Sequence, residues 1–184
     1  MSEFNYPLKA GFIGLGAMGA PMAEHLAHHQ YLEAVWNRTF SKAEAVAGRC
    51  ECRAADELSV LAEHCDVIFI CVSADDDLCF VVENLESSLS PGQIIVDHST
   101  VAPATAQKMA ALVAGRGAHF LDAPISGGVE GAINGQLSVM VGGDSEILQR
   151  IRPLIECYSS RIIHMGEIGN GQATKAVNQV LIAG

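Results

Sequence analysis

Basic residues are scarce in this sequence. Its 184 residues include 11 lysines and arginines against 21 aspartates and glutamates, which gives a formal net charge of −10. Nucleic acids and anionic membranes bind proteins through basic patches, so this balance argues against both kinds of partner. The longest apolar run, Val67–Val72, is too short to cross a bilayer, and the first residues lack the charged-then-apolar order of a secretory signal. We therefore expect a cytoplasmic protein.

A disulfide framework is also lacking. The chain has six cysteines, but it is 49% hydrophobic and long enough to form a full core without crosslinks. Cys50 and Cys52, with His64 and Cys65 further on, could suggest a metal site. However, Cys50 and Cys52 would point to opposite faces of an extended segment. We predict reduced structural thiols and no bound metal.

The most informative stretch is Gly11–Leu26, which carries three glycines in the spacing G-x-G-x-x-G. It spans the end of an apolar strand, a tight turn and the first part of an alanine-rich helix expected at Ala17–His29. Such glycines form a tight turn, let the backbone approach phosphates and allow close helix packing, while the helix N-terminus attracts the anion. The alternative is a glycine turn that binds no ligand. We expect a dinucleotide pyrophosphate at Gly14, Leu15, Gly16, Ala17, Met18 and Gly19.

Strand-like and helix-like patterns alternate along the rest of the chain. Continuous apolar runs at Val67–Val72 and Gln93–Asp97 are typical of strands buried on both faces of a parallel sheet. The alternation predicts βαβ units and hence an α/β fold with a Rossmann-type, doubly wound, mostly parallel sheet. Ligands then bind at the carboxyl ends of the strands. We also expect helices at Asp56–Glu63, capped by Asp56, and at Pro103–Ala114, and a glycine-rich loop across 122–135.

The residues at the end of the second predicted strand, Glu33–Trp36, indicate which dinucleotide binds. An acidic residue there would hold the ribose hydroxyls of NAD, but the sequence reads Trp36-Asn37-Arg38-Thr39. Arg38 can pair with a 2′-phosphate and stack on adenine, and Asn37 and Thr39 offer hydrogen bonds. This pattern favours NADP over NAD, with NAD still possible. The alternative is that Arg38 is a solvated loop residue.

Polar or glycine-rich stretches follow three more predicted strands. Val72 and Ser73 could line the ribose and nicotinamide side of the cofactor, and Thr100 could reach the nicotinamide or the substrate. The loop Ser126–Gly128 offers free N–H groups to an anion such as a carboxylate. Each stretch could instead be a turn that only closes a strand.

A polar face is expected on the last helix. Asn178 and Gln179 follow Lys175 by three and four residues, so the three side chains share a face that could bind a carboxylate or a carbonyl oxygen. A lysine whose pKa is lowered by its surroundings can act as a general acid. The alternative is a solvated helix face.

Together these stretches resemble the β-hydroxyacid dehydrogenase family. Its members include 3-hydroxyisobutyrate dehydrogenase, tartronate semialdehyde reductase, glyoxylate/succinic semialdehyde reductase and, more distantly, 6-phosphogluconate dehydrogenase. The resemblance covers essentially the whole chain. It rests on the motifs GFIGLGAMGAPMAEHL, WNRT, DHSTVAP, DAPISGGVEGAINGQLSVMVGG and GNGQATKAVNQ.

The resemblance implies hydride transfer between a nicotinamide and a small β-hydroxyacid or semialdehyde. The pair Asn178-Gln179 is similar to tartronate semialdehyde reductases, whereas WNRT is similar to NADP-using glyoxylate/succinic semialdehyde reductases, so the substrate stays open. The implied roles are proton donor for Lys175, contact between nicotinamide and substrate for Thr100, carboxylate binding for Ser126, Gly127 and Gly128, and substrate contact for Asn178 or Gln179.

The resemblance also implies two domains. Residues 1–169 correspond to the NADP-binding domain, and residues 170–184 to the start of an interdomain helix whose all-helical second domain is absent from this chain. That second domain usually builds a dimer, so we expect a homodimer or higher oligomer. Two other functions stay open, an NADP-binding sensor or scaffold without turnover and an imine reductase. Lys175 argues against both.

Overall fold

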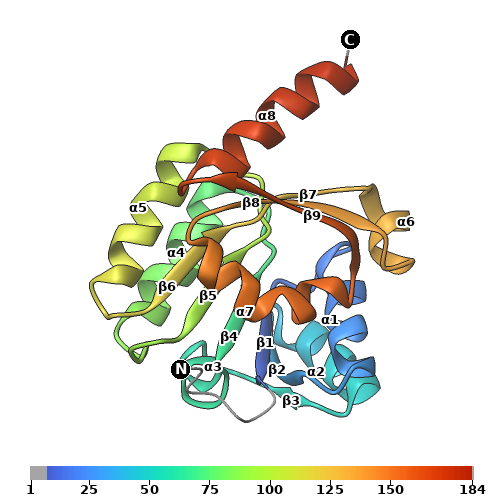
Figure 1. The fold of residues 1–184 in the computed structure, drawn as a ribbon. Coiled ribbons are helices and arrows are strands. Elements are labelled where there is room, and N and C mark those ends of the chain that lie inside the picture. The colour runs from blue at the N-terminus through green and yellow to red at the C-terminus, as the bar shows by residue number, and fades with distance from the viewer. Residues whose placement is uncertain (1–7, 184) are drawn as a thin grey trace.

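Six parallel strands form the first part of a single sheet. The computed structural model describes residues 8–183 (Figure 1). Within them the sheet runs in the order β3-β2-β1-β4-β5-β6, which is the strand order of a doubly wound dinucleotide-binding domain. These strands are β1 (Ala10–Ile13), β2 (Leu32–Trp36), β3 (Arg53–Ala54), β4 (Val67–Ile70), β5 (Ile94–Asp97) and β6 (His119–Asp122).

The sheet continues beyond β6 with a different pattern. Strand β8 (Leu137–Gly142) runs antiparallel to both β6 and β7 (Ile125–Ser126). Strand β9 (Ser159–Gly166) returns parallel to β8. The predicted doubly wound, mostly parallel sheet is therefore confirmed, and its antiparallel part lies beside the loop that follows β6.

Helices cover both faces of the sheet, because its central strands are apolar on both sides. In β4, Val67 and Phe69 join one buried cluster while Ile68 and Ile70 join the other. The first cluster is covered by α1 (Gly19–His28), α2 (Phe40–Cys50) and α7 (Ser145–Glu156), and the second by α3 (Ser59–His64), α4 (Asp75–Glu86) and α5 (Pro103–Ala114).

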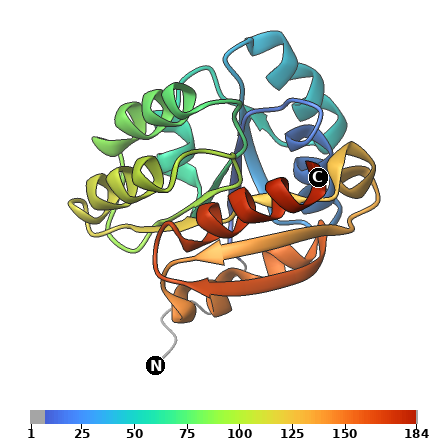
Figure 2. The ribbon, with the colours of Figure 1, turned by 90° about the horizontal axis from the view of Figure 1, so that it is seen from above.

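The last helix, α8 (Asn170–Ala183), lies across the carboxyl ends of the strands. Its first turns contact β8, β9 and α5, and its far end projects away from the sheet (Figures 1 and 2). No helix within residues 8–183 is long and apolar enough to span a membrane.

The structure corrects several expected boundaries. The expected loop 122–135 contains β7 and a short helix, α6 (Gly128–Ile133). Helix α1 begins at Gly19 instead of Ala17, because the two residues before it form a turn. Helix α3 begins at Ser59 with Leu58 in the cap position, so Asp56 does not cap it. Strand β4 ends at Ile70, which leaves the following residues in a loop at the sheet edge.

Candidate active site

The three glycines of the first turn differ in what surrounds them. Gly14 has a φ of +91°, and an added Cβ would collide with the carbonyl oxygen of Cys71. At Gly19, a Cβ would collide with the carbonyl oxygen of Gly14. At Gly16, by contrast, a Cβ would find no atom within 4 Å. The fold itself therefore explains two of the glycines, while the third faces a space that a ligand can enter.

The turn presents backbone donors to that space. The backbone N–H groups of Gly16, Ala17 and Met18 have no acceptor in the part of the chain that the structure describes. They lie at the N-terminus of α1, where the helix dipole favours an anion. These free donors and the open side of Gly16 fit the pyrophosphate of a dinucleotide.

Asn37 holds the turn in place. Its Oδ1 accepts a hydrogen bond from the Leu15 N–H at 3.0 Å, and its Nδ2 donates to the carbonyl oxygen of Thr39 at 3.0 Å. The side chain thus joins the end of β2 to the glycine turn. The hydroxyl of Thr39 makes no capping bond to α2.

A cavity of about 210 Å³ opens beside the glycine turn, between β2 and α4. We call it the arginine cavity. One wall includes Phe80, which is 54% exposed although it is large and apolar. Such a wall suits a planar base, and a nearby guanidinium can stack on it. The lining residues include Gly14, Gly16, Trp36, Arg38, Thr39, Lys42, Val72, Ser73, Asp77 and Phe80.

A second cavity, of about 340 Å³, continues from the first around the end of β4. We call it the lysine cavity. The two share Cys71, Val72 and Ser73. Its other lining residues come from four segments, and they are Met18, His98, Ser99, Thr100, Ile125, Ser126, Gly127, Gly128 and Lys175.

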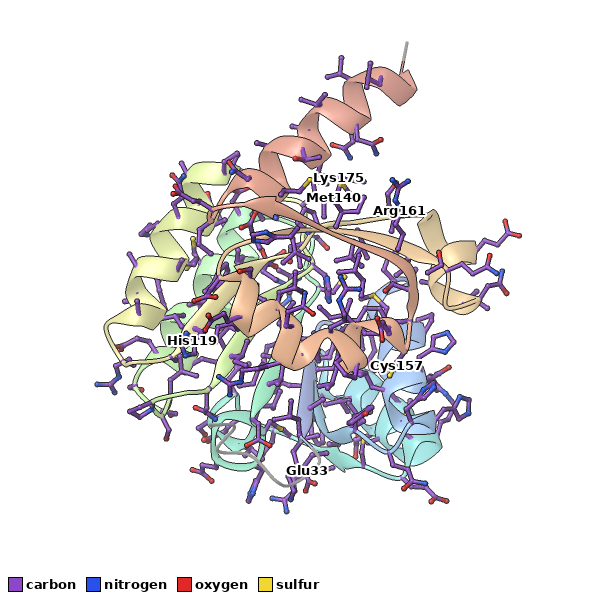
Figure 3. The ribbon with its side chains drawn as sticks, in the orientation of Figure 1. Glu33, His119, Met140, Cys157, Arg161 and Lys175 are labelled. Carbon is purple, nitrogen blue, oxygen red and sulfur yellow. The ribbon has the colours of Figure 1, made fainter. Side chains whose placement is uncertain are left out.

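Lys175 is buried in this second cavity. Its residue is 9% exposed, and it lies on the half of α8 that is nearer the sheet (Figure 3). Burial disfavours the charged ammonium and lowers the pKa of Lys175 below its usual range. No ion pair of the described residues includes this ammonium. A lysine in this state releases its proton more readily than a solvated one.

Two buried polar side chains hold α8 over the site. Asp122, at the end of β6, accepts hydrogen bonds from the N–H of Gly169 at 2.8 Å and of Gln172 at 2.9 Å. Gln172 donates to the carbonyl oxygen of Ser99 at 2.7 Å and accepts from the N–H of Val101 at 3.1 Å. The carboxylate caps the helix start, and the amide ties the loop after β5 to the helix. Lys175 and Thr100 are thereby fixed relative to each other.

His98 lines the lysine cavity as an uncharged side chain. Its Nδ1 donates to the carbonyl oxygen of Ala123 at 2.6 Å, so Nε2 accepts from the Tyr158 hydroxyl at 2.8 Å. Burial lowers the pKa of His98 to about 4. The histidine is therefore a structural contact between the loops after β5 and β6 at neutral pH.

Asp97 is the one buried side chain of the described residues with an oxygen left without a partner. Its Oδ1 accepts from the Ser99 N–H at 2.9 Å, but Oδ2 has no donor. Burial raises the pKa of Asp97 to about 7. This carboxyl shapes the loop that carries Thr100.

The structure brings most of the predicted site residues together. Ser73, Thr100, the loop Ser126–Gly128 and Lys175 line the lysine cavity, and Arg38 lines the arginine cavity. Asn178 and Gln179 do not line either cavity, since they lie one turn further along α8, half-buried and exposed respectively. The chemical roles of all these residues stay predictions.

Sequence reasoning missed Asp122, Gln172 and His98 as supports of the site. Asp122 gave one signal, a carboxylate at the end of a predicted strand. Nothing local marked the bonds themselves, because their partners lie far apart in the chain. Among residues 8–183, no group of three or more histidine, cysteine or acidic side chains could hold a metal ion.

The glycine turn, the strand order and the two joined cavities define a dinucleotide-binding domain of the Rossmann class. Residues 9–166 match the family described as the NAD binding domain of 6-phosphogluconate dehydrogenase, and the chain belongs to that family. A nicotinamide dinucleotide is therefore its cofactor class, and the predicted family resemblance is confirmed.

Two curated relatives are named as an oxidoreductase and a dehydrogenase. An uncharacterized oxidoreductase from Shewanella frigidimarina is 42% identical over 179 residues, which are 96% of this chain and 62% of the relative. An NAD-dependent L-serine dehydrogenase from Pseudomonas aeruginosa is 38% identical over 94% of this chain and 58% of its own length. The chain thus spans about three fifths of the length of these relatives.

Solved structures agree with the fold. A 3-hydroxyisobutyrate dehydrogenase from Mycobacterium tuberculosis, solved with L-serine, superposes with a TM-score of 0.91 at 31% identity, over 97% of this chain and 61% of that chain. An imine reductase from Pseudomonas sp. has a TM-score of 0.86 at 20% identity, over 97% of this chain and 62% of that chain, which shows likeness of fold alone.

Proposed function

We propose that this chain is the cofactor-binding part of an NADP-dependent oxidoreductase that acts on a small β-hydroxyacid or the corresponding semialdehyde. The supporting observation is that the buried Lys175 and the loop Ser126–Gly128 line the same cavity. That cavity continues into the one beside the glycine turn. A substrate carbonyl can thus lie between a proton donor and the nicotinamide side of the cofactor site.

In this proposal the glycine turn binds the pyrophosphate and Arg38 binds the 2′-phosphate. When bound, the nicotinamide supplies or accepts the hydride. Arg38 and Lys42 are two cations lining the arginine cavity, which supports a preference for NADP. The Pseudomonas aeruginosa relative is named NAD-dependent, so NAD remains a second cofactor within the proposal.

Lys175 acts as the general acid in the direction of reduction. Its ammonium donates a proton to the carbonyl oxygen as that oxygen gains negative charge, and in the reverse direction the neutral amine removes the proton. Burial lowers the pKa of Lys175, which favours proton release. The N–H groups of the loop Ser126–Gly128 hold the substrate carboxylate and orient the carbonyl. Thr100, which lines the same cavity, contacts the nicotinamide or the substrate.

The rest of the site would come from a second part of the protein. Val177, Val180 and Leu181 on α8 are 60%, 73% and 75% exposed, and we propose that a helical second domain packs on this face and builds a dimer. Asn178 and Gln179 would reach the substrate only in that closed arrangement. A cytoplasmic location is part of the same proposal.

A sensor without turnover and an imine reductase are the rival functions. Neither explains why a lysine is buried in the cavity and is held there by Asp122 and Gln172. No observation in the structure favours them over reduction of a semialdehyde.

A substrate panel on the full-length protein tests the proposal. Glyoxylate, tartronate semialdehyde, succinic semialdehyde, methylmalonate semialdehyde and a cyclic imine would be offered with NADPH and with NADH. We expect turnover of a semialdehyde acid, and we expect Lys175→Met to lower kcat about 10²–10⁴-fold with little change in NADP⁺ binding. Because the acid form is needed, the rate of reduction should fall as the pH rises through the pKa of Lys175.

The matched control is Lys108→Met, which removes the same charge from an exposed side chain paired with Glu83. It should leave kcat within a factor of two. Normal turnover by Lys175→Met, or turnover of the imine alone, would overturn the proposal.

A further inference from the structure

Arg38 is held by a carboxylate from a distant segment. Its Nη1 lies 2.9 Å from Oδ1 of Asp77, on the first turn of α4, and both residues line the arginine cavity. The Arg38 side chain is 80% exposed and that of Asp77 is 31% exposed. An ion pair this exposed is weak, so a ligand can compete with it.

Asp77 is the only carboxylate among the described residues that line this cavity. The neighbouring Asp75 is engaged elsewhere, because its Oδ1 accepts hydrogen bonds from the Ala102 N–H and the Thr105 hydroxyl. Asp76 is exposed and lies outside the cavity. The charges that face the cavity are therefore Arg38, Lys42 and Asp77.

A carboxylate at this place interacts differently with the adenosine ends of NAD and NADP. The adenosine ribose of NAD carries a 2′-hydroxyl, which donates a hydrogen bond to a carboxylate. In NADP the same position carries a phosphate with about 1.5 to 2 negative charges, which a nearby carboxylate repels. The phosphate must also displace Asp77 from Arg38 in order to use that guanidinium.

We propose that Asp77 is the residue that sets the balance between the two cofactors. It supplies from α4 the ribose-binding acid that is missing from the end of β2, and it weakens the attraction of Arg38 for a 2′-phosphate. The cavity then accepts NADP through Arg38 and Lys42 and accepts NAD through Asp77. This inference rests on the proposed function, in which the adenosine end of the cofactor occupies the arginine cavity.

Calorimetric titration of NADP⁺ and NAD⁺ into the protein, without substrate, tests the proposal. In Asp77→Asn we expect NADP⁺ to bind about 3- to 10-fold more tightly and NAD⁺ about 3- to 10-fold more weakly. Asp76→Asn removes the same charge one residue away and should change neither affinity by more than about twofold. Thermal unfolding of each variant checks that the fold is kept.

The opposite changes in the two affinities are the decisive result. If the effect came only from the general loss of negative charge, both cofactors would bind more tightly. Asp76→Asn would then show the same change. Two affinities that move together in Asp77→Asn, or that do not move, would overturn the role of Asp77.

Arg38→Ala separates this inference from the proposed function. We expect it to weaken NADP⁺ about 10- to 100-fold and NAD⁺ little. If Arg38→Ala leaves NADP⁺ binding unchanged, the proposed preference for NADP fails, while the NAD⁺ result of Asp77→Asn still decides whether Asp77 binds the ribose.

Discussion

The arginine cavity and the lysine cavity share a wall but are built in different ways. The first is lined by charged side chains that solvent can reach. Among them, Nη1 of Arg38 lies 2.9 Å from Oδ1 of Asp77. The second is held by buried polar groups, among them Asp122, Gln172 and His98, each with hydrogen-bond partners from other segments. Exposed charges can be rearranged by a ligand at little cost, whereas buried polar networks fix one arrangement. The arginine cavity is thus adjustable, and the lysine cavity is rigid.

Substitutions in the glycine turn should give the largest effects. They distinguish a glycine that the fold requires from one that the ligand requires. Gly19→Ala places a methyl group against the carbonyl oxygen of Gly14, in backbone that cannot yield, so we expect a loss of about 4 kcal/mol or more in the free energy of unfolding. Gly16→Ala meets no protein atom and should fold normally. It should instead weaken NADP⁺ binding about 10- to 100-fold, because the methyl group takes space that the pyrophosphate needs.

Urea unfolding and NADP⁺ titration of both variants measure these effects. The distinction would fail if Gly16→Ala were as unstable as Gly19→Ala, or if it bound NADP⁺ normally.

The buried acid at the end of β5 should give the next largest effect. Asp97 has a pKa of 3.8 when unperturbed and about 7 in the folded protein, so its contribution to stability is present at low pH and is lost as the pH rises to about 7. Asparagine does not titrate. The free energy of unfolding of Asp97→Asn, relative to the native protein, should therefore rise between about pH 4 and pH 7 by on the order of 3 kcal/mol.

His98 provides the internal comparison for that prediction. Its pKa falls from 6.5 to about 4 on folding, so its contribution is present above pH 6.5 and is lost as the pH falls toward 4. Between about pH 4 and pH 7 the contributions of Asp97 and His98 to stability change in opposite directions. In Asp97→Asn, the loss of stability on acidification that comes from His98 should therefore become visible. A difference between the two proteins that does not vary with pH would show that Asp97 does not titrate in this range.

Removing the charge of Asp122, which caps α8, should give the smallest of the three effects on stability. It should also lower the activity. Asp122→Asn keeps the size of the side chain but leaves one of the two N–H groups of Gly169 and Gln172 without an acceptor, which should cost about 1–3 kcal/mol. Because α8 carries Lys175, kcat should fall too. Asp144→Asn is the control, since Oδ1 of Asp144 alone accepts both capping bonds of α7, at 2.7 Å and 3.4 Å, away from the site. An asparagine there can keep both bonds, so the stability and kcat should change little.

Urea unfolding and steady-state reduction by the full-length protein measure both properties. If Asp122→Asn lost stability but kept the native kcat, the rigid placement of Lys175 would not matter for the reaction.

The parts of the fold with strong local patterns were predictable from the sequence. The apolar run at β4 and the helix Pro103–Ala114 were recognised because burial on both faces and a proline at a helix start leave clear marks. The region 122–135 was wrongly expected to be a loop, because glycines that permit tight turns also occur in α6. The start of α3 was missed because Asp56 looked like a cap and is not used as one.

Except in the region 122–135, the sequence by itself determined the order of strands and helices along the chain. It also determined the glycine turn and the presence of Arg38 and Lys175, since each depends on residue types at short spacing. Only the tertiary structure decided which side chains surround these two cations and hold them in place. Asp77 reaches Arg38 across 39 residues, Asp122 holds α8 across 47, and Gln172 joins α8 to Ser99 across 73. Contacts over such separations arise when the parallel strands bring their carboxyl ends to one edge, and no local pattern encodes which side chains meet there.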